Sequence, residues 1–192
     1  MMGKTHKAAG CLAMLLAYEV LDSKGLILQN VNPFVQLAVM YPACSWASTA
    51  PDLDQSSMDT IPEKTPISLL LYHILHIGRI KHRSWQTHSP WMFLVIVDSL
   101  WGSLYWLYTA TGASLNVIIL RLILTGFSVG FASHLIMDMF TYEGIPIGGK
   151  KHIRLVPHTD TFKTNTTYET VVRRLLYVAI IGIIIWKGLM TV

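Results

Sequence analysis

Long apolar runs alternate with short polar segments along the whole chain, and this pattern predicts a bundle of membrane-spanning helices. Four runs cover residues 8–21, 34–50, 90–111 and 115–140, and a fifth extends from 175 to 192. As a helix, the fourth run is about 39 Å long at about 1.5 Å per residue, which is enough to cross a bilayer. We therefore expect an all-α membrane protein with about five transmembrane helices, in one domain over residues 1–192.

One further apolar segment, residues 67–80, is too short to cross a bilayer. It carries His73 and His76, which lie three apart and so share one face of a helix. We interpret this segment as an amphipathic helix at the membrane surface, and both imidazoles as interfacial residues rather than metal ligands.

Composition supports a membrane protein and argues against a soluble domain or a nucleic-acid-binding protein. The chain is 52% apolar and only 14% charged, with a mean hydropathy of +0.45, whereas soluble domains have about 25% charged residues. The net charge of +4 is typical of basic cytoplasmic loops in a membrane protein, so nucleic acid is not an expected partner. Cys11 and Cys44 lie in apolar runs without the spacing of a metal site, and we interpret them as buried hydrophobic residues.

Counting the predicted crossings brings the polar residues with metal-binding chemistry to one side of the membrane. If each long run crosses once, seven candidate donors fall on that side: His6, Asp52, Asp54, His82, His88, His134 and Asp138. All of the fifteen Lys and Arg residues except Lys24, Arg121 and Lys187 lie there too. The excess of positive charge predicts that this side faces the cytoplasm.

The candidate donors have the chemistry of a divalent metal site. His134 and Asp138 are four apart near the end of a helical run, so they share one face and could chelate an ion; a packing hydrogen bond is the alternative. Asp52 and Asp54 repel one another unless a cation or a proton separates them or the loop is exposed. Seven donors exceed the needs of one tetrahedral ion and would suit a two-metal site, which can clamp a phosphoryl group.

Glu19, Asp98 and Arg121 are charged residues inside the predicted spans and outside the donor set. Glu19 and Arg121 fall near the end opposite the donors, and from depth alone we expect them to pair across two helices. Asp98 lies about two turns into its helix from the donor side. We expect it either to orient a ligand imidazole or to pack in the interior in its protonated form.

Four sequence features together resemble a known family: an N-terminal His before an apolar run, PDLD at 51–54, HRSWQTHS at 82–89, and SHLIMDMFTYEGIP at 133–146. They are similar to the YdjM-like, LexA-regulated, membrane-bound metal-dependent hydrolases, over residues 3 to about 157. In the family pattern, the two His residues of the block that corresponds to HRSWQTHS are five positions apart, and Gly follows the Arg. Here His82 and His88 are six apart and Ser84 replaces the Gly, which leaves His82 as a ligand, a general acid or a loop residue.

The resemblance also implies a function, because the family is similar to zinc-dependent phospholipase C and P1-type nucleases. It implies hydrolysis of a phosphoester with one to three divalent ions, zinc being the expected metal. By position, the implied ligands are His6, Asp52, Asp54, His88, His134 and Asp138. We assign catalytic roles to three residues, with Asp54 or His82 as the proton carrier and Arg83 as a phosphate-binding residue.

The predicted partners are a membrane lipid and a phosphoester substrate, because a site at the inner-membrane surface would lie at the depth of the lipid headgroups. The alternative is a non-catalytic membrane protein with a structural or sensory metal site, which docks a cytoplasmic partner through the basic segment 150–174. Transport of a metal ion is disfavoured because the second and fifth runs offer almost no polar residues along a path across the bilayer. The sequence does not specify an oligomeric state.

Overall fold

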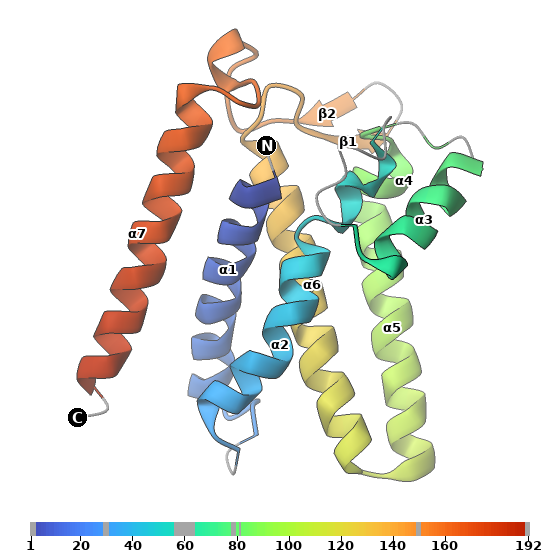
Figure 1. Ribbon diagram of the computed structural model, residues 1–192. Helices are drawn as coiled ribbons and strands as arrows, with labels where there is room; N and C mark the ends of the chain where they lie inside the picture. The colour runs from blue at the N-terminus through green and yellow to red at the C-terminus, as the bar shows by residue number, and fades with distance from the viewer. Residues whose placement is uncertain are drawn as a thin grey trace.

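A computed structural model describes residues 3–28, 31–55, 64–77, 80, 82–148 and 151–190. Within these ranges the fold is all-α apart from one small hairpin (Figure 1). The helices are α1 (Gly3–Ser23), α2 (Pro33–Ala47), α3 (Pro66–Ile77), α4 (Trp85–His88), α5 (Pro90–Thr111), α6 (Leu115–Met139) and α7 (Thr167–Met190). Two 3-10 helices, η1 (Ala50–Asp54) and η3 (Asp160–Phe162), and two antiparallel strands, β1 (Ile145–Gly148) and β2 (Lys151–Ile153), complete it.

The sequence sets the ends of the two longest apolar helices. Ser89 caps α5 by accepting a hydrogen bond from the Met92 amide (3.1 Å), and Pro90 follows at the first helical position, where its missing N–H costs nothing. Gly112 ends α5 with a φ of 72°, a left-handed conformation that glycine adopts without strain. Ser114 then caps α6 through the Val117 amide. These caps produce the tight turn between antiparallel helices.

The helices alternate in direction, which places the predicted donor segments at one end of the bundle. In Figure 1, α1, α5 and α7 run away from the end that holds the N-terminus, while α2 and α6 return to it. The start of α1, η1 after α2, α4 before α5, the end of α6 and the hairpin therefore gather at that end, which we call the site end.

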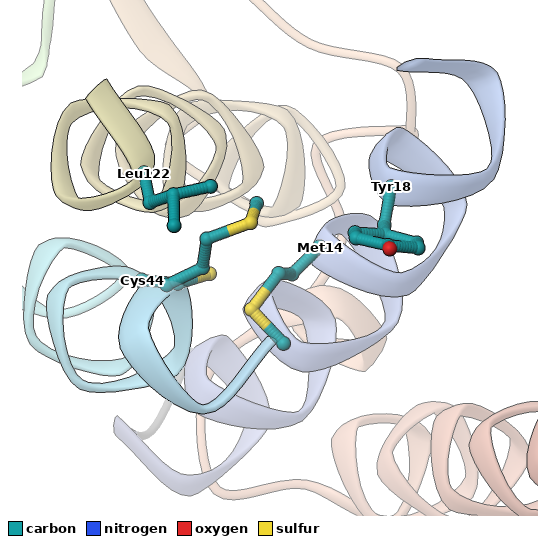
Figure 2. Packing of buried hydrophobic residues seen from close by; sticks show 5 residues of the cluster. Met14, Tyr18, Cys44 and Leu122 are labelled. Carbon is teal, nitrogen blue, oxygen red and sulfur yellow. The ribbon is translucent and has the colours of Figure 1, made fainter. Parts of the chain in front are cut away.

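Helix α6 lies at the centre of the bundle and packs on α1, α2 and α5. Its closest approach is to α2, where Gly126 faces the backbone of Met40 and Gly130 faces that of Cys44. Around this contact, Met14 and Tyr18 of α1 meet Cys44 and Leu122 in the main hydrophobic cluster (Figure 2). Close packing of small residues is a common way of joining helices in membranes.

Two helices among the described residues, α5 and α6, are long and apolar enough to cross a membrane. Two of the five predicted spans thus meet this test of length and composition. Helix α2 has 15 residues, which give a length of only about 22 Å. Helices α1 and α7 are long enough, but each carries charged residues in its sequence near both ends.

Several expectations need correction. The pairing of Glu19 with Arg121 is wrong: Glu19 forms an ion pair with Lys187 of α7, and the Arg121 Nη2 donates to the Leu26 carbonyl at 2.6 Å. Asp98 is exposed on α5, so it neither orients a ligand imidazole nor packs in the interior.

Several element boundaries also differ from the sequence analysis, and one element was not expected. The second run is helical only to Ala47 and continues as η1, and the hairpin was not predicted. The last helix begins at Thr167 and not at residue 175, because its polar first turn is anchored by the buried Glu169. The Glu169 carboxylate accepts hydrogen bonds from the Thr5 hydroxyl of α1 and from the Asn165 amide, both at 2.8 Å. Lys150, which opens the basic segment 150–174, lies outside the described residues.

Candidate metal centre

Six of the predicted donors come together at the site end and are buried there. His6 lies in the second turn of α1, and His88 is the last residue of α4. The remaining four come from η1 and from the end of α6: Asp52, Asp54, His134 and Asp138. All six residues have relative exposures of 3% or less. The alternating direction of the helices is what places segments far apart in the sequence beside one another.

Two groups of donors could each hold an ion. The first comprises His6, Asp52 and His134, and the second comprises His88, His134 and Asp138. Within each group the potential ligand atoms lie within 4.8 Å of one another. The His134 Nε2 lies 3.4 Å from Asp138 Oδ2, and the His88 Nε2 lies 3.6 Å from the same oxygen. Since His134 belongs to both groups, the donors form one continuous cluster, in which His134 could bind an ion together with either group.

The buried polar atoms of this cluster fit a divalent cation. Among the described residues, both ring nitrogens of His6, the Nε2 atoms of His88 and His134, and Asp52 Oδ2 have no hydrogen-bond partner in the protein. Leaving such a group buried without a partner costs about 1–3 kcal/mol. Imidazole nitrogen and carboxylate oxygen are ligands that zinc and similar ions prefer. An ion would satisfy several of these atoms at once.

Hydrogen bonds on the far side of two imidazoles set which nitrogen faces the cluster. The His134 Nδ1 lies 2.9 Å from the carbonyl oxygen of Ser48, so it carries the proton and donates. Its Nε2 then presents a lone pair to the cluster. The His88 Nδ1 lies 3.0 Å from Thr87 Oγ1 and 3.3 Å from Asp54 Oδ2. Outer contacts of this kind orient metal-binding histidines in proteins.

Asp54 differs from Asp52 because both of its oxygens are engaged by protein donors. Its Oδ1 lies 2.7 Å from the His82 Nδ1. Its Oδ2 accepts the Arg83 amide at 3.0 Å and the Thr87 hydroxyl. Asp54 is not a member of either donor group, so its contacts favour a role in orienting His82 and His88.

The charge states follow from the same contacts. Burial alone would raise the pKa of Asp54, but its contacts with His82, His88 and Thr87 lower that pKa to about 2. Burial likewise opposes ionisation of Asp52, whose pKa nevertheless falls well below its usual value because of His134 and His88. In His88, burial is outweighed by Asp52 and Asp54, which raise the pKa to about 9. A cation bound through His88 would displace that proton.

His82 and Arg83 connect the buried cluster to the surface. The His82 side chain is 41% exposed, and Arg83 adopts a left-handed backbone conformation with a φ of 54°. The Arg83 guanidinium donates to Thr141 Oγ1 at 3.1 Å and to Asp138 Oδ1 at 3.3 Å, and it forms an ion pair with Glu143 Oε2 at 3.2 Å. This turn lets the His82 ring and the next backbone amide reach the same carboxylate.

The sequence analysis did not assign roles to several residues of this region. The Ser48 carbonyl that orients His134 carries no side-chain signal, and Glu143 sits in a loop without a metal-ligand spacing. Thr141 had a signal, since it follows Asp138 by three residues in the family-like block. By contrast, His73 and His76 lie on α3 outside both donor groups, and the His76 Nδ1 contacts the Tyr72 carbonyl at 3.2 Å.

A model of the YdjM inner membrane protein family matches residues 1–191, almost the whole chain. The chain belongs to this family. The YdjM assignment confirms the resemblance inferred from the four sequence features, and the family's description agrees with the two apolar helices α5 and α6. Comparison with curated proteins and comparison with solved structures gave no match. The site of this YdjM family member is therefore interpreted from its own geometry.

Proposed function

We propose that the protein is a metal-dependent hydrolase of the inner membrane that cleaves a phosphoester at the cytoplasmic surface. The observation that carries this proposal is a set of buried imidazole nitrogens and one Asp52 oxygen without hydrogen-bond partners among the described residues. They lie next to an arginine and a histidine that reach the surface. A purely structural hydrogen-bond cluster would pair these atoms with one another. The contacts of Asp52 with His6, His88 and His134 are instead 3.6–3.9 Å long, which is too long for hydrogen bonds.

The residues proposed to hold the metal are those of the two donor groups: His6, Asp52, His88, His134 and Asp138. Zinc is the ion that best fits three imidazoles and two carboxylates. A bound divalent ion of this kind lowers the pKa of water to near neutrality and polarises a phosphoryl oxygen.

Asp54, His82 and Arg83 supply the remaining chemistry. The Asp54 Oδ1 accepts the Nδ1 proton of His82, with 2.7 Å between the two heavy atoms. The Nε2 atom of the half-exposed ring is then left to donate a proton to the substrate or to accept one from it. The Arg83 guanidinium lines a hollow at the protein surface, where its planar donors suit two oxygens of a phosphate. In this assignment Asp54 orients and His82 transfers the proton.

Replacement of Asp54 by Asn tests this assignment. Loss of the carboxylate removes the anchor of His82, so hydrolysis of phosphodiesters and phosphomonoesters by the zinc-loaded protein should fall at least about 100-fold. Turnover is measured on a panel of both ester classes, with Asp22→Asn at the opposite end of α1 as the matched control. Wild-type protein that binds zinc but hydrolyses no member of the panel would favour the alternative, a structural or sensory site that docks a cytoplasmic partner.

The proposed topology has five crossings, with the site end in the cytoplasm. Cysteines placed at Gln55 and at Glu143 should be labelled from the cytoplasmic side, and a cysteine at Ala113 from the opposite side. The measurement uses a membrane-impermeant maleimide on intact and on opened cells, in a background with Cys11 and Cys44 replaced by Ala. Labelling of positions 55 and 143 from different sides would refute the arrangement.

A further inference from the structure

Two hollows open at the surface on either side of the residues that reach the metal centre. They share His82, Arg83 and Glu143 as a common wall. The first hollow has a volume of about 320 Å³ and is otherwise lined by Thr141, Tyr142, Phe162, Lys163 and Thr164. The second has a volume of about 390 Å³ and is otherwise lined by His152, Arg154 and His158.

The shared wall lies directly over the buried cluster. Arg83 contacts Asp138 at 3.3 Å, and His82 contacts Asp54 at 2.7 Å, while both residues line both hollows. A phosphate bound by Arg83 would therefore lie between the two hollows and next to the donor groups. Glu143 now pairs with Arg83 at 3.2 Å, but its side chain is 58% exposed, so an anion could take its place while the carboxylate turns to water.

Each hollow has, besides Arg83, one Lys or Arg side chain of its own in its lining. In the first, the half-exposed Lys163 pairs with Asp160 at 2.8 Å and lies 5.3 Å from the centre of the Tyr142 ring. In the second, Arg154 donates to the Tyr142 carbonyl at 3.5 Å. The His158 ring lies tilted against the Tyr142 ring, with 3.6 Å between the two ring centres. Both hollows are thus suited to polar or anionic groups. Each cation lies next to Tyr142, Lys163 near its ring and Arg154 at its carbonyl oxygen.

A phosphomonoester carries one substituent on its phosphate, whereas a phosphodiester carries two. We propose that the ligand of this site is a phosphodiester whose phosphate binds at Arg83 and whose two substituents occupy one hollow each. This inference rests on the proposed function for the place of the phosphate, and it narrows the substrate class from phosphoesters to diesters. Lys163 and Arg154 are then specificity-determining residues, one for each substituent.

The same surface lies where lipid headgroups would be. Trp91, in the first turn of the apolar helix α5, is 61% exposed and donates its indole N–H to the Ile147 carbonyl of β1 at 3.0 Å. Tryptophan is enriched at the membrane–water interface, so this bond holds the hairpin close to the headgroups. A glycerophospholipid and a soluble glycerophosphodiester share the required chemistry, and the experiment separates these two sources.

The test measures equilibrium binding of two non-hydrolysable phosphonate analogues to the full chain in nanodiscs. One analogue is that of glycerophosphoglycerol, a diester, and the other is that of glycerol 3-phosphate, a monoester. Lys163→Gln and Arg154→Gln should each weaken diester binding about threefold to tenfold, since each removes one charged contact at a partly exposed site. Only one of the two changes should weaken monoester binding. Lys24→Gln, at the opposite end, is the matched control.

Two results would overturn the inference: diester binding that neither change weakens, or monoester binding that both weaken to the same degree. Failure here is distinguishable from failure of the proposed function. If both variants bind the diester normally while Asp54→Asn still abolishes hydrolysis, the hydrolase stands and the two-hollow assignment is wrong. If the wild type hydrolyses nothing, but both variants weaken diester binding and only one weakens monoester binding, the diester-binding site is supported and the hydrolase proposal is not.

A lipid-borne analogue in the nanodisc, built on phosphatidylglycerol, identifies the source of the diester. Weaker binding of this lipid in both variants supports the inference and assigns a membrane lipid. The same pattern confined to the soluble analogue also supports the inference and assigns a soluble diester. Each variant is first shown to retain wild-type metal content, because neither Lys163 nor Arg154 belongs to a donor group.

Discussion

Replacing His134 by Ala should lower metal affinity at least about 100-fold, the largest loss expected for any single donor. His134 belongs to both donor groups, and its Nε2 is directed at the cluster because the Ser48 carbonyl accepts the proton of its Nδ1 at 2.9 Å. Loss of an outer contact alone typically costs 10–100-fold in metal affinity, and loss of a ligand should exceed that. Bound metal is measured by inductively coupled plasma mass spectrometry after equilibration with buffered zinc.

His73→Ala is the matched control, since this imidazole is exposed on α3 and belongs to neither donor group. It should retain the metal content of the wild type. Thr87→Val supplies an intermediate case, because it removes no donor and only outer contacts, to the His88 Nδ1 at 3.0 Å and to Asp54 Oδ2. Equal metal content in wild type and His134→Ala would refute the metal centre itself, whatever the activity of either protein.

The depth of each polar residue could be predicted from the sequence, but its direction around the helix could not. The ends of α5 and α6 follow from Ser, Pro and Gly at helix termini, and counting crossings brought His6 and Asp138 to one end. Glu19 and Arg121 do lie near one depth, yet Glu19 faces α7 and pairs with Lys187. A hydropathy profile averages over the faces of a helix, so it could not distinguish these partners.

The hydrogen-bond partners of the individual donors could not be predicted from residue types and their spacing either. PDLD predicted that both carboxylates bind metal, but Asp54 is engaged by His82, Arg83 and Thr87, whereas Asp52 Oδ2 faces the cluster without a hydrogen-bond partner. The difference arises from η1, which turns the two side chains in different directions, and from the left-handed backbone at Arg83. Neither conformation has a specific sequence signal, because the residue that needs a positive φ here is not glycine.

The position of η1 depends in turn on the contact between α2 and α6. Gly130 faces the backbone of Cys44, and the next turn of α2 leads to Ser48, whose carbonyl orients His134. The two carboxylates of η1 follow within six residues. The distance between the two helix axes at Gly130 therefore determines whether the donors of η1 and those of α6 lie in reach of a common ion.

Gly130→Ala should destabilise the protein by about 1–3 kcal/mol and reduce its metal content. An added Cβ would overlap the Cys44 carbonyl oxygen and lie 2.9 Å from the Cys44 Cα. Backbone atoms cannot rotate away as a side chain can, so α2 must move and carry η1 with it. Stability is measured by reversible unfolding in mixed micelles, and metal content as for His134→Ala.

Gly102→Ala on α5 is the matched control, because a Cβ there meets nothing within 4 Å. It makes the same chemical change within an exposed helix, where alanine is favoured over glycine by up to about 1 kcal/mol. Its stability should equal or exceed that of the wild type, with unchanged metal content. If Gly130→Ala instead unfolds like Gly102→Ala and retains its metal, the close approach of α2 and α6 does not hold the site together.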